Sequence, residues 1–187
     1  MFESVKRSIK GFGNFSEEDM AEIISRLKVI PVERGTALIK EGQVCREFYF
    51  INKGCLRQYA VLDNGSEAIL NLFVEEDWAF DYKSFMAQQP TETIVEAVED
   101  SEVFMLSGWH FHELVKISDG FFRIGRIFEQ ALQNQDYQNN RLSPEEKYAL
   151  LLASKPQLIQ KFPLKYIASY LGITPETLSR VRRKITS

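Results

Sequence analysis

The chain has 187 residues, a formal net charge of −3, 44% hydrophobic residues and 12% aromatic residues. This composition supports the core of one large domain or two small ones, and there is no run of about 18 apolar residues to span a membrane. The first residues, MFESVKRSIKGF, lack the apolar run of a secretory signal, so we expect a cytoplasmic protein.

Cysteines and histidines are scarce and scattered. Cys45 and Cys55 are expected to be reduced, partly buried thiols, since no secretion signal precedes them. His110 and His112 lie two residues apart, so on a helix they point to different sides and are expected at its surface. We therefore predict no zinc site, no iron–sulfur cluster, no haem and no other cofactor. With no Ser/His/Asp set and no glycine-rich phosphate loop, the chain is not expected to be an enzyme.

The N-terminal half begins with a predicted helix and continues as short strands. Residues 16–28 have a capping serine, Ser16, acids in the first turn and an apolar stripe, which predicts a helix. Runs rich in β-branched and aromatic residues then alternate with turn residues, and Asn64-Gly65 is the strongest hairpin signal. The pattern predicts an antiparallel barrel or roll with strands within 29–35, 36–43, 47–54, 55–65, 66–77 and 93–107.

A second helical region starts near Gly108, with a short helix over 109–116 and a longer one over about 121–141. Apolar residues recur along the longer helix at spacings of three and four. This seam either covers the roll or pairs with a second copy of the chain; we favour a dimerisation helix. The predicted dimer residues are Phe121, Ile124, Phe128, Leu132 and Gln135.

The remaining residues predict a further helix and then a pair of short helices. Ser143 and Pro144 start a helix, and the following segment 157–163 has room for only a short hairpin. In LKYIASYLGITPETLSRVRRK, a small Ala168 is followed by the turn residue Gly172, a capping Thr174 and Pro175. The same features describe any helical hairpin, but the basic residues gathered in one element of an acidic chain favour a DNA-reading helix-turn-helix. The predicted DNA contacts are Lys165, Thr174, Glu176, Thr177, Ser179, Arg180, Arg182, Arg183 and Lys184.

This order of elements resembles the Crp/Fnr family of bacterial transcription regulators, on the strength of ERGTALIKEGQ…FYFINKGCLRQY and IASYLGITPETLSRVRRKI. The resemblance implies an α+β fold. It comprises an antiparallel double-stranded β-helix (a jelly-roll-like β-roll) with flanking helices, a long dimerisation helix and an all-α helix-turn-helix domain. The implied domains are a cyclic-nucleotide-binding-like sensor roll over 1–118, the dimerisation helix over 119–142 and the DNA-binding domain over 143–187.

The resemblance also assigns roles within the second helix of the pair. Glu176 and Arg180 fall where relatives read the base edges of TGTGA-like half-sites, by accepting from cytosine and donating to guanine. Pro175 occupies a position that holds an arginine in those relatives, which leaves the half-site open. Only three residues follow Lys184, so we expect no β-hairpin wing and expect helix ends and basic side chains to make the phosphate contacts.

The ligand cassette departs from the family. Where cyclic-nucleotide binders carry Gly-Glu and then Arg-Ser or Arg-Thr, this chain has Phe80-Asp81 and Thr91-Glu92. A carboxylate in place of arginine repels a phosphate, so we expect no cyclic AMP. A different small molecule, a protein contact and a purely structural role all remain open for the roll. The candidate effector pocket is Trp78, Phe80, Asp81, Tyr82, Phe85, Thr91 and Glu92.

The sequence therefore predicts a homodimeric, sequence-specific DNA-binding transcription regulator with an unidentified effector. The expected partners are double-stranded DNA, a second copy of the chain, RNA polymerase and a small-molecule effector, and not a membrane. The alternative is a small-molecule or protein-binding module of the cyclic-nucleotide-domain type whose DNA binding is vestigial.

Overall fold

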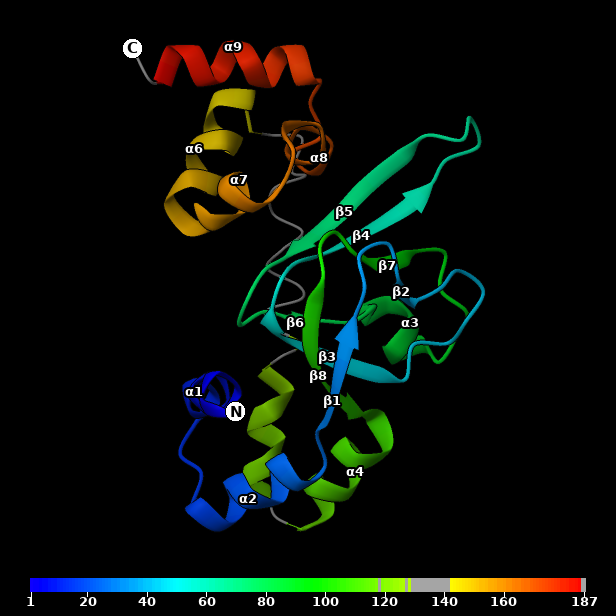
Figure 1. Ribbon diagram of the computed structural model, residues 1–187, viewed down its shortest axis with the longest axis vertical. Coiled ribbons are helices and arrows are strands. Elements are labelled where there is room, and N and C mark those ends of the chain that lie inside the picture. Colours follow the sequence, from blue (N-terminus) through cyan, green and yellow to red (C-terminus); the bar gives the residue numbers. More distant parts are fainter. Residues whose placement is uncertain (118, 127, 129–141, 186–187) are drawn as a thin grey trace.

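The computed structural model describes residues 1–117, 119–126, 128 and 142–185. The C-terminal helices lie at one end of the long axis, the strands in the middle, and α1, α2 and α4 at the other end (Figure 1). None of the described helices is long and apolar enough to cross a bilayer.

Two helices precede the strands. The predicted helix over 16–28 is α2 (Glu17–Ser25), where Ser16 and Asp19 form a reciprocal capping box. It is shorter than expected because the chain enters β1 at Lys28. Helix α1 (Glu3–Phe12) was not predicted, although Val5, Ile9 and Phe12 recur at helical spacing and are buried.

The predicted antiparallel roll is confirmed as two four-stranded sheets with the orders β1-β8-β3-β6 and β2-β7-β4-β5. The predicted Asn-Gly hairpin joins β4 and β5; Gly65 has a φ of +78°, and the Leu62 amide donates to the Ser66 carbonyl at 2.8 Å. The strands are β1 (Lys28–Val32), β2 (Ala37–Ile39), β3 (Glu47–Lys53), β4 (Leu56–Val61), β5 (Glu67–Phe73), β6 (Trp78–Ala79), β7 (Ile94–Ala97) and β8 (Ser101–Ser107), with helix α3 (Tyr82–Ala87) between β6 and β7.

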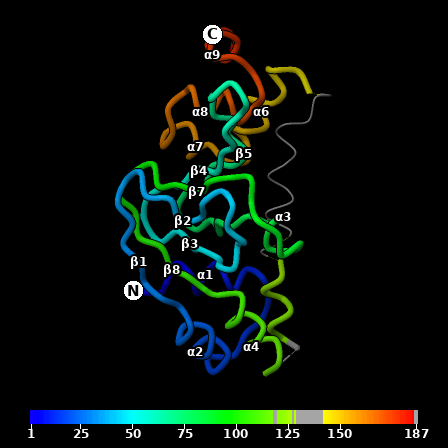
Figure 2. The backbone as a smooth tube through the Cα atoms, turned by 90° about the vertical axis from the view of Figure 1, so that its right-hand side faces the viewer, coloured from blue at the N-terminus to red at the C-terminus, as the bar shows by residue number. Residues whose placement is uncertain are grey.

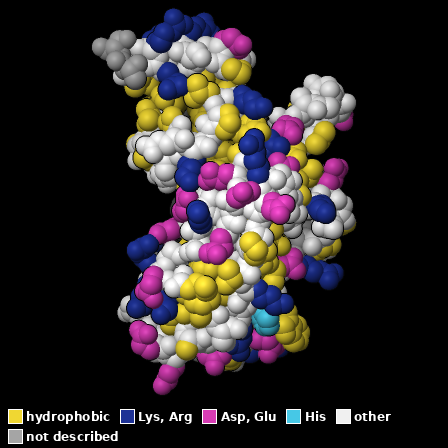
Figure 3. Space-filling model, viewed as in Figure 1, with side chains coloured by type: hydrophobic (Ala, Val, Ile, Leu, Met, Phe, Trp, Pro, Cys, Tyr) yellow, Lys and Arg dark blue, Asp and Glu magenta, His cyan; other side chains and the backbone are white. Residues whose placement is uncertain are grey.

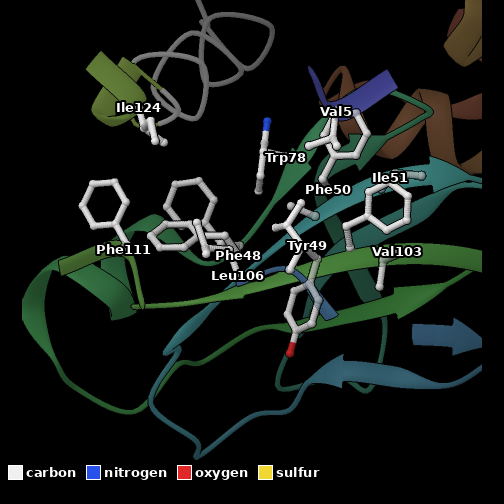
Figure 4. Packing of buried hydrophobic residues seen from close by; sticks show 14 of the residues in the cluster. Val5, Phe48, Tyr49, Phe50, Ile51, Trp78, Val103, Leu106, Phe111 and Ile124 are labelled. Carbon is white, nitrogen blue, oxygen red and sulfur yellow. The ribbon is translucent and has the colours of Figure 1, made fainter. Parts of the chain in front are cut away.

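The main core fills the roll and continues under the helices at its open end (Figure 4). Phe50 lies at its centre, with its ring centroid 5.2 Å from Trp78 and 6.1 Å from Phe104. Cys45 and Cys55 are free, buried thiols, as expected, and burial raises the pKa of Cys45 to about 11 and that of Cys55 to about 12. Both thiols are therefore poor nucleophiles in the folded chain.

The segment after β8 differs from the predicted dimerisation helix. Helix α4 (Gly108–Ile117) matches the short predicted helix, but Asp119–Gly125 forms a 3₁₀ helix, η1. Phe121 and Ile124 are each 1% exposed and pack in the chain's own core, so assigning them to a dimer seam was wrong. Phe128 also packs against this core, while Leu132 and Gln135 lie outside the described residues. An apolar repeat does not say which surface covers it, and here α1, α4 and Phe15 of the same chain cover its first part.

Four helices complete the chain: α6 (Pro144–Ser154), α7 (Gln157–Lys161), α8 (Leu164–Tyr170) and α9 (Pro175–Ile185). The predicted start of α6 is confirmed, with Ser143 and Glu146 in a capping box. Helix α7 occupies the segment expected to hold a short hairpin. These helices share a second core with the outer face of β4 and β5, and Figure 2 shows the β4–β5 hairpin rising beside α8.

Candidate functional sites

The turn between α8 and α9 has the local geometry that its sequence predicts. Gly172 has a φ of +66°, in the left-handed region where a side chain is disfavoured, and its amide donates to the Ser169 carbonyl at 3.0 Å. Thr174 caps α9 by accepting from the Thr177 amide at 3.2 Å, and Pro175 is the first residue of the helix. The two helices are therefore joined by a short, hydrogen-bonded turn.

Packing divides the surface of α9 into two faces. Leu178 and Val181 are buried against α6 and α8, and Ala168 is fully buried in α8, where the helices approach each other. Of the predicted DNA contacts in α9 and its cap, Thr177 and Arg182 are half-buried, and Thr174, Glu176, Ser179, Arg180, Arg183 and Lys184 are exposed. The remaining predicted contact, Lys165, is an exposed residue of α8. Figure 3 shows Lys and Arg side chains gathered over α9 at the end of the molecule.

Short-range polar contacts hold several of these side chains. Arg180 donates to the Thr177 hydroxyl at 3.3 Å, and Lys184 forms an ion pair with Glu145 of α6 at 2.9 Å. A hydrogen bond from its own backbone amide, helped by Thr174 and by the positive charge of Arg180, lowers the pKa of Glu176, so this carboxylate is ionised at neutral pH. The face therefore presents one acceptor carboxylate beside a basic cluster.

A buried lysine that the sequence reasoning missed supports the turn. Lys147 of α6 is 4% exposed, and its ammonium donates to the Leu171 carbonyl at 2.9 Å. A cation at this place satisfies a carbonyl at the C-terminal end of α8. Nothing in the sequence distinguishes Lys147 from an ordinary surface lysine of a capped helix.

In the roll, Asp81 is the centre of a closed hydrogen-bond network. One carboxylate oxygen accepts from the Ser84 amide at 2.9 Å and so caps α3. The other accepts from the hydroxyls of Thr91 and Thr93 and, at 3.3 Å, from the amide of Gln58. Both oxygens are therefore used within the chain.

Aromatic rings fill the space beside this network. Phe80 and Phe85 pack with Phe48 and Phe128, with ring centroids 4.6–6.2 Å apart, and Tyr82 lies 6.4 Å from Phe80.

Two predicted members of the pocket lie apart from these residues. Trp78 points towards α1, with its Nε1 donating to the Ser8 hydroxyl at 3.2 Å (Figure 4). Glu92 is exposed, in contrast to its buried neighbour Thr91. The structure therefore brings together five of the seven predicted pocket residues and places these two apart from them.

The residues present do not fit a cyclic phosphate. The segment from Trp78 to Ile94 contains no arginine, and its one lysine, Lys83, is exposed. Each carboxylate oxygen of Asp81 already accepts from the chain's own groups, so a ribose hydroxyl would compete with them. Within the described residues, no group of three His, Cys, Asp or Glu side chains is arranged to hold a metal ion.

The arginine nearest in sequence to this region faces the other way. Arg57 of β4 is buried on the outer side of the sheet, where it pairs with Glu67 and with Glu96, the latter at 3.1 Å. Its guanidinium carbon lies 4.2 Å from the ring centroid of Tyr59 and 4.8 Å from that of Tyr166 in α8. Burial lowers the pKa of Arg57, but the bond to Glu67 and the charge of Glu96 outweigh it and raise the pKa overall. Sequence reasoning missed this contact because its partners come from four separate segments.

Comparison with known proteins agrees with this architecture. The sequence of residues 29–118 matches the cyclic nucleotide-binding domain family. The matched residues run from β1 to the end of α4 and include every strand of the roll. No sequence among curated proteins matches the chain.

Solved structures similar to most of the chain include several transcription regulators. The catabolite activator protein of Thermus thermophilus is 19% identical with a TM-score of 0.59, and covers 96% of this chain and 86% of its own. FixK2 of Bradyrhizobium japonicum is 16% identical with a TM-score of 0.67, and the match covers 86% of this chain and 84% of FixK2. The sensor domain of the transcriptional regulator DNR from Pseudomonas aeruginosa is 15% identical with a TM-score of 0.59, and the match covers 74% of this chain and 91% of that domain. At these identities the likeness shows a shared fold: a cyclic nucleotide-binding domain carrying C-terminal helices.

Proposed function

We propose that this protein is a homodimeric, sequence-specific DNA-binding transcription regulator of the Crp/Fnr type. In this proposal α8 and α9 form a helix-turn-helix, and α9 enters the major groove. The observation that carries it is the exposed basic face of α9, which follows a capped start and a glycine turn and lies opposite the buried Leu178 and Val181. The names of the structural neighbours support the same role.

Glu176 and Arg180 are the proposed base-reading residues. They lie four residues apart, on one side of α9 and near its start, where the helix can approach base edges. Lys165, Arg182, Arg183 and Lys184 would contact phosphates, and Thr174, Thr177 and Ser179 would contribute hydroxyl groups. Because phosphate contacts release counterions, affinity should fall steeply as salt rises.

The domain around Asp81 is proposed as the sensor part, with an effector other than a cyclic nucleotide. The proposal for the effector region keeps Phe80, Asp81, Tyr82, Phe85 and Thr91. RNA polymerase is the proposed partner at a promoter. A dimer is proposed because a helix-turn-helix reads two half-sites related by a two-fold axis.

The test is selection of binding sites from a random double-stranded DNA library, followed by mobility shift at several salt concentrations. We expect Arg180→Ala to weaken binding to the selected site by about 5- to 150-fold and to relax the base preference at one position of each half-site. The matched control is Arg34→Ala, which removes the same charge from an exposed residue in the turn after β1. Selection that yields no enriched site, or equal effects of the two substitutions, contradicts the proposal and favours a binding module with vestigial DNA contacts.

A further inference from the structure

Strand β4 faces two different environments. Successive side chains of a strand point to opposite faces of its sheet. On β4, Gln58 points into the roll, where it joins the Asp81 network, while Arg57 and Tyr59 point outwards to the C-terminal helices. Adjacent residues of one strand therefore contact the candidate effector region and the proposed DNA-binding helices.

The inner contacts hold Gln58 at both ends of its amide. Its nitrogen donates to Asp81 at 3.3 Å and to the Thr93 hydroxyl at 2.9 Å, and its oxygen accepts from Asn71 of β5 at 2.7 Å. The Asn71 oxygen is buried and, within the described part of the chain, has no hydrogen-bond partner. An unpaired buried acceptor is costly, so a rearrangement that supplies a donor to it is favoured.

The outer contacts hold the C-terminal helices on the sheet. Arg57 lies between the rings of Tyr59 and Tyr166, and Tyr59 also donates to Glu96 at 3.1 Å. On the neighbouring edge strand, the Ile69 amide donates to the Ser169 hydroxyl of α8 at 2.9 Å. Further ion pairs join these helices to loops of the roll, from Lys155 to Asp77 at 3.2 Å and from Lys161 to Glu75 and Glu99 at 2.8 and 3.0 Å.

We propose that β4 couples the two regions: a change in the hydrogen bonds of Gln58 inside the roll loosens the Arg57–Tyr166 contact outside it. The backbone shift that re-aims Gln58 also moves Arg57, because both side chains leave the same strand segment. Arg57 is held by the carboxylates of Glu67 and Glu96 and by two tyrosine rings, so it cannot follow the strand without losing contacts. The regulatory meaning of this coupling rests on the proposed function; the coupling itself does not require DNA.

The experiment is amide hydrogen exchange on the full chain without DNA, followed in peptides from α8 and β5. Arg57→Met should raise exchange of α8 by about tenfold, since it removes the stacked cation and its ion pairs. Gln58→Leu should raise exchange of α8 by a similar factor, although Gln58 touches no residue of that helix in the contacts described above. Thr93→Val, which removes only one hydroxyl from the inner network, should act in the same direction and serves if Gln58→Leu does not fold.

The matched control is Val103→Ala, which weakens the roll core in the other sheet, on β8. It should leave exchange of α8 within about twofold of wild type, since its effect is confined to the core around β8. The proposal is overturned if the inner substitutions leave α8 at the wild-type rate while Arg57→Met raises it. It is also overturned if Val103→Ala raises exchange as much as Gln58→Leu. Failure to bind DNA leaves these outcomes unaffected and counts only against the proposed function.

Discussion

Replacing Lys147 by Met tests whether a buried cation stabilises the turn before α9. Methionine keeps the length and apolar character of the side chain but removes the ammonium that donates to the Leu171 carbonyl at 2.9 Å. Because Lys147 is 4% exposed, water cannot readily replace the lost donor. Leu171 directly precedes Gly172, so the effect falls on the turn itself.

The change in the free energy of unfolding combines two stabilising contributions of the ammonium with one opposing cost. A hydrogen bond from a charged donor contributes about 1.5–3 kcal/mol, and a cation at a helix C-terminus adds about 0.3–2 kcal/mol. Burying an ammonium costs several kcal/mol, and methionine relieves that cost. We expect a net loss of about 1–2 kcal/mol, because the carbonyl is left without its donor. For a chain of this size, that lowers the melting temperature by about 2–8 °C.

Thermal unfolding followed by circular dichroism measures the shift, and hydrogen exchange in α8 and α9 locates it. Lys40→Met is the control, since Lys40 is an exposed residue after β2, and its loss should change stability by less than about 0.5 kcal/mol. A Lys147→Met protein as stable as wild type would show that the burial cost of the ammonium equals or exceeds its bond, and the capping argument would then be wrong.

Two further predictions concern the C-terminal helices. Gly172→Ala should destabilise the chain by about 1–2 kcal/mol through its positive φ alone, because an added Cβ would lie 3.7 Å from the nearest atom, in ordinary contact; urea unfolding measures it. Burial raises the pKa of Glu75, but the hydrogen bond from Lys161, the backbone amides of Glu75 and Gly54, and the charge of Lys161 together outweigh it and lower the pKa below the ordinary 4.5. The carboxylate therefore stabilises docking above pH 4.5, and that stability is lost as the pH falls through the lower folded value, which hydrogen exchange in α7 and α8 between pH 3 and 6 measures.

Both the Gly172 prediction and the Glu75 prediction have a control within the chain. Gly11→Ala, in α1 and with open space around it, should be neutral or stabilising, since its backbone is an ordinary helix. Equal losses at both glycines would contradict the argument from φ. Glu75→Gln should weaken the acid dependence of docking. If exchange in α7 and α8 depends on pH as in the wild type, the dependence comes from other carboxylates such as Asp77.

Local signals in the sequence predicted local structure well. The Asn64-Gly65 hairpin and the Ser16 and Ser143 caps depend on a few adjacent residues, and each was found where expected. Phe121 and Ile124 were misassigned to a dimer seam because spacing reveals that residues are buried but not what buries them.

Contacts between distant segments carried no such signal. Arg57 meets Tyr166, more than a hundred positions later, and Trp78 turns towards Ser8 rather than the cassette. Their partners are fixed by the order of strands and by the docking of helices, and neither leaves a periodic pattern in the sequence. The same holds for the hydrogen bond from Lys147 to the Leu171 carbonyl.

By itself, the sequence determined the alternation of strands, the helix caps, the glycine turn before Thr174 and the loss of the cassette arginine, because each depends on neighbouring residues or on residue type alone. Only the tertiary structure decided that Asp81 is hydrogen-bonded within the chain, that Phe121 is buried in the chain's own core, and that Arg57 joins the roll to α8. The physical reason is that burial and pairing depend on which surfaces meet, and those surfaces are brought together by the whole fold.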